Sequence, residues 1–254
     1  MMTETPQKAR KSRYSRRISG GLQESWIFMQ YTNVSAGRFL DRPNRFIAHV
    51  ETPEGVQTVH VKNTGRCREL LVPGAKVYLE RSANPARKTA FDLIAVQKGT
   101  RLINMDAQAP NKVFAEWAAG FLPEGAQLHR EYAYGASRLD FCIQTEKNLH
   151  FVEVKGVTLE ENGAARFPDA PTERGVKHIQ ELQRAVEAGL QATLFFVVQM
   201  ADIQSVAPND TTHPAFGSAL RKAAERGVNV LAYDCTVTAE RLAIRRPVPV
   251  LLGL

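Results

Sequence analysis

Ser137-Arg-Leu-Asp-Phe-Cys-Ile143 and His150-Phe-Val-Glu-Val-Lys155 are the two stretches that decide the fold of this 254-residue chain. In each, β-branched and aromatic residues alternate with others, and the polar run Thr145-Glu-Lys-Asn148 lies between them. This pattern predicts a β-hairpin. A turn centred on Glu146 and Lys147 places Asp140 directly opposite Glu153. We expect one apolar face and one polar face, formed respectively by Leu139, Phe141, Ile143, Val152 and Val154, and by Asp140, Glu153 and Lys155.

Two carboxylates that face each other across strands have Cβ atoms about 5 Å apart and repel each other. A hard divalent cation between them removes this penalty, because Mg²⁺ prefers carboxylate oxygen and keeps several waters. Lys155 points the same way as Glu153 and could orient such a water. Asp followed by Glu-x-Lys is the pattern of the PD-(D/E)XK nuclease fold. The alternative is an ordinary solvated face, since short matches to this pattern also arise by chance.

Composition indicates an ordinary globular protein, with 44% hydrophobic and 23% charged residues. No apolar run approaches the ~20 residues of a membrane helix, so we expect no membrane partner. Cys67, Cys142 and Cys235 are far apart and form no metal-type pair. They predict buried thiols in the reducing cytoplasm.

The net charge of +7 is concentrated at the N-terminus. Residues 1–17 carry six basic side chains against Glu4 alone, which leaves the rest near +2. We expect residues 1–20 to be a disordered basic tail. It could hold nucleic-acid phosphates or serve solubility alone.

From Ile27 to Gln97 we expect five short strands with tight turns, which favours a small OB-like barrel. The clearest strands are Arg45–Val50, Val56–Val61, Lys76–Glu80 and Lys88–Val96. Several basic side chains lie near the predicted turns: Arg66, Arg68, Arg81, Arg87 and Lys88. They could form a rim that follows a phosphate backbone, or they could simply belong to polar loops.

After Gly99 the pattern alternates between helices and strands. We expect a helix over 109–120 that carries Glu116, a strand over 128–134, and an unstructured site loop over 156–171. A helix over 172–188 follows, with Val176, Ile179, Leu182, Gln183 and Val186 inward. Its outer face is expected to hold Arg174, Lys177, His178 and Glu181, either for substrate phosphates or as a solvated face.

The remaining elements are a buried strand over 192–198, a helix over 214–226 and a last strand over 228–233. This order predicts an antiparallel hairpin joined to parallel strands, with helices on both faces. We therefore predict a mixed α/β (α+β) chain with an N-terminal OB-like β-barrel and a C-terminal PD-(D/E)XK nuclease-like mixed sheet. The predicted boundaries are 21–100 and 101–245, with a C-terminal tail over 246–254.

The chain also resembles the sugar fermentation stimulation protein A (SfsA) family over residues 40–245. The motifs that carry the resemblance are Asn63-Thr-Gly-Arg66, Pro110-Asn111, Tyr134-Gly-Ala136, Arg138-Leu-Asp-Phe141, Phe151-Val-Glu-Val-Lys155, Val157-Thr-Leu159, Phe167-Pro-Asp-Ala170, Thr172-Glu-Arg-Gly175 and Lys177-His178. Two positions depart from the family pattern. Cys67 stands where methionine is usual, and Gly156 replaces the usual serine at the edge of the site.

The resemblance implies an OB-fold followed by a PD-(D/E)XK-type domain. It also implies DNA binding with little sequence preference, and a regulatory link to maltose metabolism in bacteria. Glu116, Asp140, Glu153 and Lys155 are the nuclease-type positions, and the first three are the expected ligands of Mg²⁺ or Mn²⁺.

Two hypotheses follow. One is a metal-dependent DNA phosphodiesterase, with Arg174 and His178 on the substrate backbone. The other is a DNA-binding regulator that does not cut. In both, contacts would be mostly to phosphate, since no helix-turn-helix or zinc finger is evident.

Overall fold

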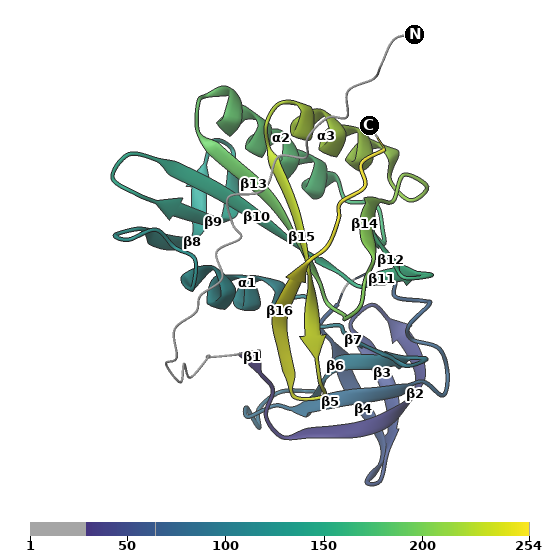
Figure 1. Cartoon of the computed structure of the whole chain (residues 1–254). Coiled ribbons are helices and arrows are strands. Elements are labelled where there is room, and N and C mark those ends of the chain that lie inside the picture. The colour runs from purple at the N-terminus through teal and green to yellow at the C-terminus, as the bar shows by residue number, and fades with distance from the viewer. Residues whose placement is uncertain (1–28, 64, 254) are drawn as a thin grey trace.

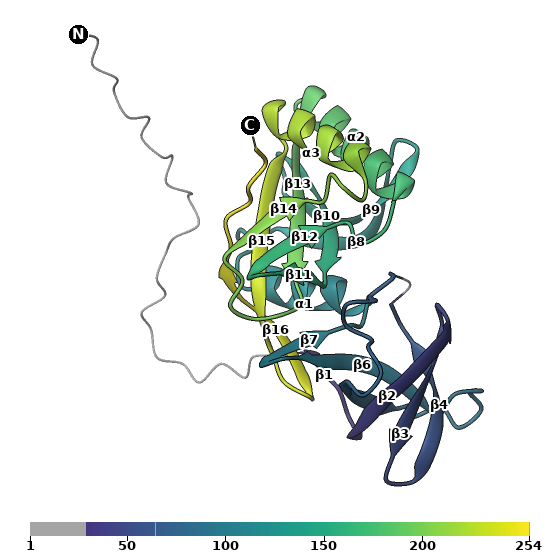
Figure 2. The same cartoon turned by 90° about the vertical axis from the view of Figure 1, so that its right-hand side faces the viewer.

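The computed structural model describes residues 29–63 and 65–253, which form two domains stacked one above the other (Figures 1 and 2). The predicted basic tail over 1–20 lies outside the described residues. Within these ranges no helix is both long and apolar enough to cross a bilayer. All three cysteines are free and buried, as predicted.

The N-terminal domain is a six-stranded antiparallel sheet in the order β4-β3-β2-β5-β6-β7, and additional β4–β6 pairing at His60 and Asp92 closes it into a barrel. Its strands are β2 (Val34–Asn44), β3 (Ile47–Thr52), β4 (Gly55–Val61), β5 (Lys76–Arg81), β6 (Phe91–Lys98) and β7 (Arg101–Asn104). The predicted OB-like barrel is confirmed. The pairing of β7 with β6 extends this sheet past the predicted boundary at residue 100.

The C-terminal domain contains a seven-stranded sheet in the order β1-β16-β15-β13-β10-β9-β8. Its strands are β1 (Met29–Gln30), β8 (Gln127–Tyr134), β9 (Ser137–Gln144), β10 (Leu149–Val157), β13 (Gln191–Val198), β15 (Asn229–Val237) and β16 (Arg241–Pro247). The β9–β10 pair is antiparallel, whereas β10, β13 and β15 are parallel, as predicted. Strand β16 follows β15 and was missed, because Arg241–Pro247 is rich in arginine and ends in proline.

Helices cover both faces of this sheet. The helices are α1 (Ala109–Ala119), α2 (Glu173–Glu187) and α3 (Pro214–Glu225). Helices α2 and α3 lie side by side in both views (Figures 1 and 2) and share one apolar cluster with Leu139 and Phe151. Helix α1 packs in a second cluster with Phe141 and Val152. The predicted apolar face of the hairpin is therefore correct except at Leu139. Leu139 packs on the α2 side instead, at the point where β9 stops pairing with β10.

The stretch predicted to be an unstructured loop over 156–171 is largely folded. Strand β10 continues to Val157, and β11 (Leu159–Glu161), β12 (Ala164–Phe167) and β14 (Ser205–Pro208) form a small third sheet. Asn162 and Gly163 both have positive φ, 52° and 84°, and connect β11 to β12. Two consecutive positive-φ residues make the tight hairpin turn that Asn-Gly favours.

Candidate functional site

The β9–β10 hairpin has the predicted register. Its ladder pairs His150 with Ile143 and ends at Val152 with Phe141, one position before Asp140 and Glu153. Beyond this point the two strands separate, and Asp140 Oδ2 accepts a hydrogen bond from the Val154 main-chain N–H at 2.8 Å. The Asp140 side chain thus binds the main chain of β10 next to Glu153.

Asp140 is also bound by α1. Asn111, in the first turn of this helix, donates from Nδ2 to Asp140 Oδ1 at 2.9 Å. Burial raises the pKa of Asp140 above its usual range, and the charge of Glu153 raises it further. The two carboxylates are therefore close enough to oppose each other's ionisation.

Glu153 is 1% exposed and accepts from three donors, of which the Asp140 main-chain N–H lies 3.4 Å from Oε2. Lys155 Nζ lies 2.6 Å from Glu153 Oε1, and His178 on α2 makes a short hydrogen bond to the same oxygen through Nδ1. Burial alone would raise the pKa of Glu153, but the bond from His178 and the charge of Lys155 outweigh it and lower the pKa. Glu153 is consequently held ionised inside the domain.

His178 has a different place from the one predicted. It is 5% exposed and bound to Glu153, so it does not lie on a solvated helix face where phosphates could reach it. Arg174 Nε donates to His178 Nε2 at 3.3 Å. Because a guanidinium can only donate, Nε2 must accept, and the ring proton is assigned to Nδ1, which faces Glu153. Glu181, predicted to be outward, is also buried, and it accepts from Arg184.

Glu116 does not join this pair. Its Oε2 accepts a hydrogen bond from the Met29 main-chain N–H at 2.8 Å, at the start of β1. On an α-helix five residues span about 7.5 Å of rise and more than one turn, so Asn111 and Glu116 point to different sides of α1. Within residues 29–63 and 65–253 no group of three acidic, histidine or cysteine side chains is placed to hold a metal. Asp140 and Glu153 are thus the two carboxylates that the structure brings together, and Glu116 as a third ligand stays a prediction.

The predicted phosphate-binding residues separate into distinct places. Arg66 and Arg68 are exposed and, with Arg42 and Arg45, line a hollow of about 350 Å³ on the barrel. Arg42 donates to the main-chain oxygens of Asn63, Gly65 and Arg66 at 2.7–3.1 Å, which shapes this loop.

Arg87 is instead bound to the carboxylate of Asp92 by two hydrogen bonds, at 2.7 and 2.9 Å. This pair gives Arg87 a structural partner within the barrel, and its contact with phosphates stays a prediction. Lys88 is exposed beside it. Arg174 and Lys177 are exposed on α2, and Lys177 donates to the Ala136 carbonyl at 3.1 Å.

The barrel loop that contains Gly65 and Arg66 lies next to Asp169, which precedes α2 in the sequence. A side chain at Gly65 would collide with the Asp169 carboxylate unless that carboxylate moved, so the main chain at Gly65 lies close to Asp169. Burial raises the pKa of Asp169, while Arg66 and Arg42 act to lower it. Because Asp169 lies just before α2, the arginine hollow of the barrel lies close to the N-terminal end of the helix that carries Arg174 and His178.

Asn111 and Arg42 are site residues that sequence reasoning did not assign. Asn111 is part of a Pro-Asn pair at the start of a helix, and its polar side chain beside an apolar face was the available signal.

The packing around Gly156 explains why this position is a glycine. A Cβ there would lie 2.5 Å from Gln199 Oε1 and 2.6 Å from Pro110 Cγ, so the usual serine does not fit this packing.

Family comparisons agree with this two-domain arrangement. Residues 40–105 match the model of the SfsA N-terminal OB domain, and residues 108–241 match that of the sugar fermentation stimulation protein RE domain. The chain belongs to the sugar fermentation stimulation protein (SfsA) family. A homolog from Ruminiclostridium cellulolyticum is 53% identical over 226 residues, covering 88% of this chain and all of the relative. One from Desulfitobacterium hafniense is 54% identical, covering 84% and 94% respectively.

A solved SfsA structure has the same fold. The Pyrococcus furiosus protein, described in complex with Ca²⁺, superposes with a TM-score of 0.80 at 29% identity. The match covers 88% of this chain and 98% of that chain. The SfsA architecture therefore spans both domains, with the Asp140–Glu153 pair inside the second.

Proposed function

We propose that this SfsA protein binds DNA without sequence preference and, with Mg²⁺ or Mn²⁺, hydrolyses its phosphodiester bonds at Asp140, Glu153 and Lys155. The observation that carries the proposal is the conjunction of these three groups on one hairpin. Lys155 Nζ lies 2.6 Å from Glu153 Oε1. Asp140 accepts a hydrogen bond from the main-chain N–H of Val154, the residue between Glu153 and Lys155 in the sequence. Metal-dependent hydrolysis needs oxygen ligands and a group that positions water.

The donor set fits a hard divalent cation. Asp140 and Glu153 would hold Mg²⁺ or Mn²⁺, together with a main-chain carbonyl near Val154, since carboxylate and carbonyl oxygens are the preferred ligands. Each carboxylate has about four acceptor sites. Asp140 accepts from Asn111 and Val154, and Glu153 accepts from Lys155, His178 and the Asp140 main-chain N–H, so both leave room for a metal. The complex of the Pyrococcus furiosus relative with Ca²⁺ supports the same class of ion. A bound cation would supply positive charge where the phosphate gains negative charge in the transition state.

The chain's own residues would do the remaining work. Lys155 would orient the attacking water, and its positive charge would stabilise the hydroxide that forms when that water releases a proton to solvent. His178 would fix the orientation of Glu153 through Nδ1, and Arg174 would fix the tautomer of His178. His178 and Arg174 would thus fix the position of the Glu153 carboxylate. The exposed part of the Arg174 guanidinium could also bind a phosphate.

DNA would be held mainly through phosphates. The exposed Arg66 and Arg68 line the barrel hollow, and Arg174 and Lys177 lie on the neighbouring helix. Arginine suits bidentate phosphate binding, and such contacts carry no base information. Free buried cysteines fit a reducing compartment, so we place this activity in the cytoplasm.

A second candidate is a DNA-binding regulator, linked to sugar metabolism, that does not cut. It is favoured by the position of Glu116, which is bound to Met29 and leaves two carboxylates rather than three for a metal. In this case Asp140 and Glu153 would serve structure or metal-dependent binding alone.

Cleavage assays distinguish the two candidates. Supercoiled, linear and single-stranded DNA would be incubated with Mg²⁺, Mn²⁺ or chelator, with wild type and with Glu153→Gln prepared identically. The proposal predicts metal-dependent cleavage that falls by at least about a hundredfold in the variant, because one carboxylate of the site is lost. Cleavage that persists in Glu153→Gln would exclude this site, and metal-independent binding without cleavage would favour the regulator.

A further inference from the structure

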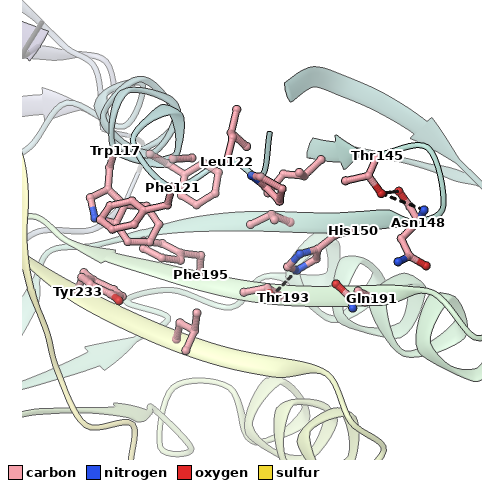
Figure 3. A pocket seen from close by; sticks show the side chains of 16 residues that line it. Trp117, Phe121, Leu122, Thr145, Asn148, His150, Gln191, Thr193, Phe195 and Tyr233 are labelled. Atoms are coloured by element: carbon pink, nitrogen blue, oxygen red, sulfur yellow. Dashed lines mark hydrogen bonds between the residues drawn. The ribbon is translucent and has the colours of Figure 1, made fainter. Parts of the chain in front are cut away.

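A hollow of about 270 Å³ lies on the α1 side of the seven-stranded sheet, away from the side that carries Glu153 and His178 (Figure 3). Helix α1 ends at Ala119, so the sheet beyond it, toward the tip of the β9–β10 hairpin, has no helix over it. Val152 and Phe195 form part of its floor. The hollow is thus a product of a helix that is shorter than the sheet it covers.

Aromatic rings form one end of the hollow (Figure 3). Trp117 has ring-centroid distances of 4.8 Å to Phe121 and 4.9 Å to Tyr233, and Tyr233 stacks on Phe195 at 5.2 Å. Phe121 is 49% exposed, although it is a large apolar side chain. A flat ring placed against this group would bury exposed apolar surface and gain ring–ring contacts.

Uncharged polar groups form the other end. His150 Nε2 and Thr193 Oγ1 are hydrogen-bonded at 2.8 Å, and the side chains of Asn148 and Gln191 lie at the rim (Figure 3). Burial lowers the pKa of His150, so its imidazole is neutral at pH 7. The lining contains no aspartate, glutamate, lysine or arginine among the described residues. It offers hydrogen bonds but no counter-ion for a phosphate or carboxylate.

We propose that this hollow binds an uncharged heteroaromatic molecule of about nucleoside size, with its ring against Trp117 and its polar edge toward His150 and Gln191. The size follows from the volume, which is just below the ~300 Å³ of the smallest common ligand sites. The absence of charge in the lining favours a free molecule over a base within a phosphate-bearing strand. The site does not depend on the proposed metal chemistry, because Glu153 faces the opposite helix layer.

Tryptophan fluorescence provides a direct test. The chain has two tryptophans, Trp26 and Trp117, so Trp26→Phe leaves a single reporter within the hollow. Adenosine, guanosine, cytidine and thymidine would be titrated into this full-length variant, with AMP and a short single-stranded oligonucleotide as separate arms. We expect saturable quenching by at least one nucleoside, with a Kd on the order of 0.1 mM for about twenty heavy atoms, and at least tenfold weaker binding of AMP. No saturation by any nucleoside at ten times that concentration would overturn the proposal.

Two adjacent alanines give matched variants. Ala118 lines the hollow, whereas Ala119 is exposed. In the Trp26→Phe background, Ala118→Leu should weaken nucleoside binding at least tenfold by filling the space, and Ala119→Leu should leave it unchanged. If Ala118→Leu does not fold, Thr193→Val tests the polar end and should weaken binding several-fold. An oligonucleotide that binds more tightly than its nucleoside, and is blocked by Ala118→Leu, would overturn the assignment to a free ligand.

Discussion

Glu153 interacts with Asp140, as the sequence predicts, and also with His178, which the sequence places on the outer face of a helix. Its opposition to Asp140 could be predicted, because a polar turn of even length fixes the hairpin register. Its bond to His178 could not, because the periodicity of a helix does not say how deeply an adjacent strand is covered. His178 lies on the same side of the helix as Arg174, so the pattern of charged residues predicts that both lie on its outer face. Packing of α2 against β10 places the imidazole on a buried carboxylate instead.

His178→Asn is predicted to lower the metal-dependent activity by roughly ten- to hundredfold, because a hydrogen bond to a charged group contributes about 1.5–3 kcal/mol. The loss should appear mainly in kcat, and the pKa of Glu153 should rise, since the bond from His178 helps to lower it. The pH profile of cleavage would show this rise as an acid limb moved to higher pH. A variant with reduced activity but an unmoved limb would contradict a positioning role.

Asp92 should make stability depend on pH in the acid range. Burial opposes its ionisation, but hydrogen bonds from Arg87 and His60 and the charge of Lys62 lower the pKa from 3.8 to about 2. A lowered pKa stabilises the fold above pH 3.8, and this contribution is lost as the pH falls toward 2. It amounts to about 2 kcal/mol. Urea unfolding of wild type and Asp92→Asn should therefore show a stability difference at pH 7 that shrinks between about pH 4 and pH 2. A difference independent of pH would contradict the assignment.

Among the elements, the long strands and amphipathic helices could be predicted, and the short strands could not. Strand β13 is nearly all apolar, and α3 buries Phe216, Leu220 and Ala223 as its periodicity predicts. Strands β11 and β12 have three and four residues, too few for alternation to be visible. The Asn162-Gly163 pair was the available signal for their hairpin. The segment is held against the barrel by Glu160, which binds Lys98 and Arg101 at 2.8 and 2.9 Å.

Gly156→Ser tests the packing of β10 against α1. The added Cβ would meet Gln199, whose side chain is buried and hydrogen-bonded to Asn104, so it cannot move freely. We expect a loss of about 1–3 kcal/mol in the free energy of unfolding, the usual cost of overpacking. Gly120→Ala is the matched control, since Gly120 is exposed with φ −75° and should tolerate a side chain. Equal stability of wild type and Gly156→Ser in urea unfolding would show that the site relaxes.

In the molecule as a whole, the two domains meet through buried polar contacts. Lys62 of the barrel binds Asp106 at 3.1 Å, and Gln199 of the second domain donates to Asn104 and to the Asp106 carbonyl. Such partners belong to segments distant in sequence, so composition and periodicity could not pair them. The order of the two domains could be predicted from the succession of strands and helices.

The arginine hollow is expected to contribute to DNA affinity through phosphates alone. Replacing Arg66 and Arg68 by alanine should weaken binding equally for unrelated sequences and reduce the slope of log K against log salt by up to about 2. Arg226→Ala is the control, because Arg226 is an exposed arginine paired with Glu187 outside the hollow, and its loss should leave the slope unchanged. Fluorescence anisotropy with two oligonucleotide duplexes at several salt concentrations measures both quantities. A loss confined to one sequence would contradict backbone binding.

The proposed divalent-metal site consists of Asp140 and Glu153 together and does not include Glu116. Calorimetric titration of the metal-free protein with Mn²⁺ tests this most directly. We predict one ion per chain in wild type and in Glu116→Gln, with affinity reduced at least tenfold in Asp140→Asn, which keeps the shape of the side chain but removes its charge. Unchanged binding in Asp140→Asn, or loss of binding in Glu116→Gln alone, would contradict it.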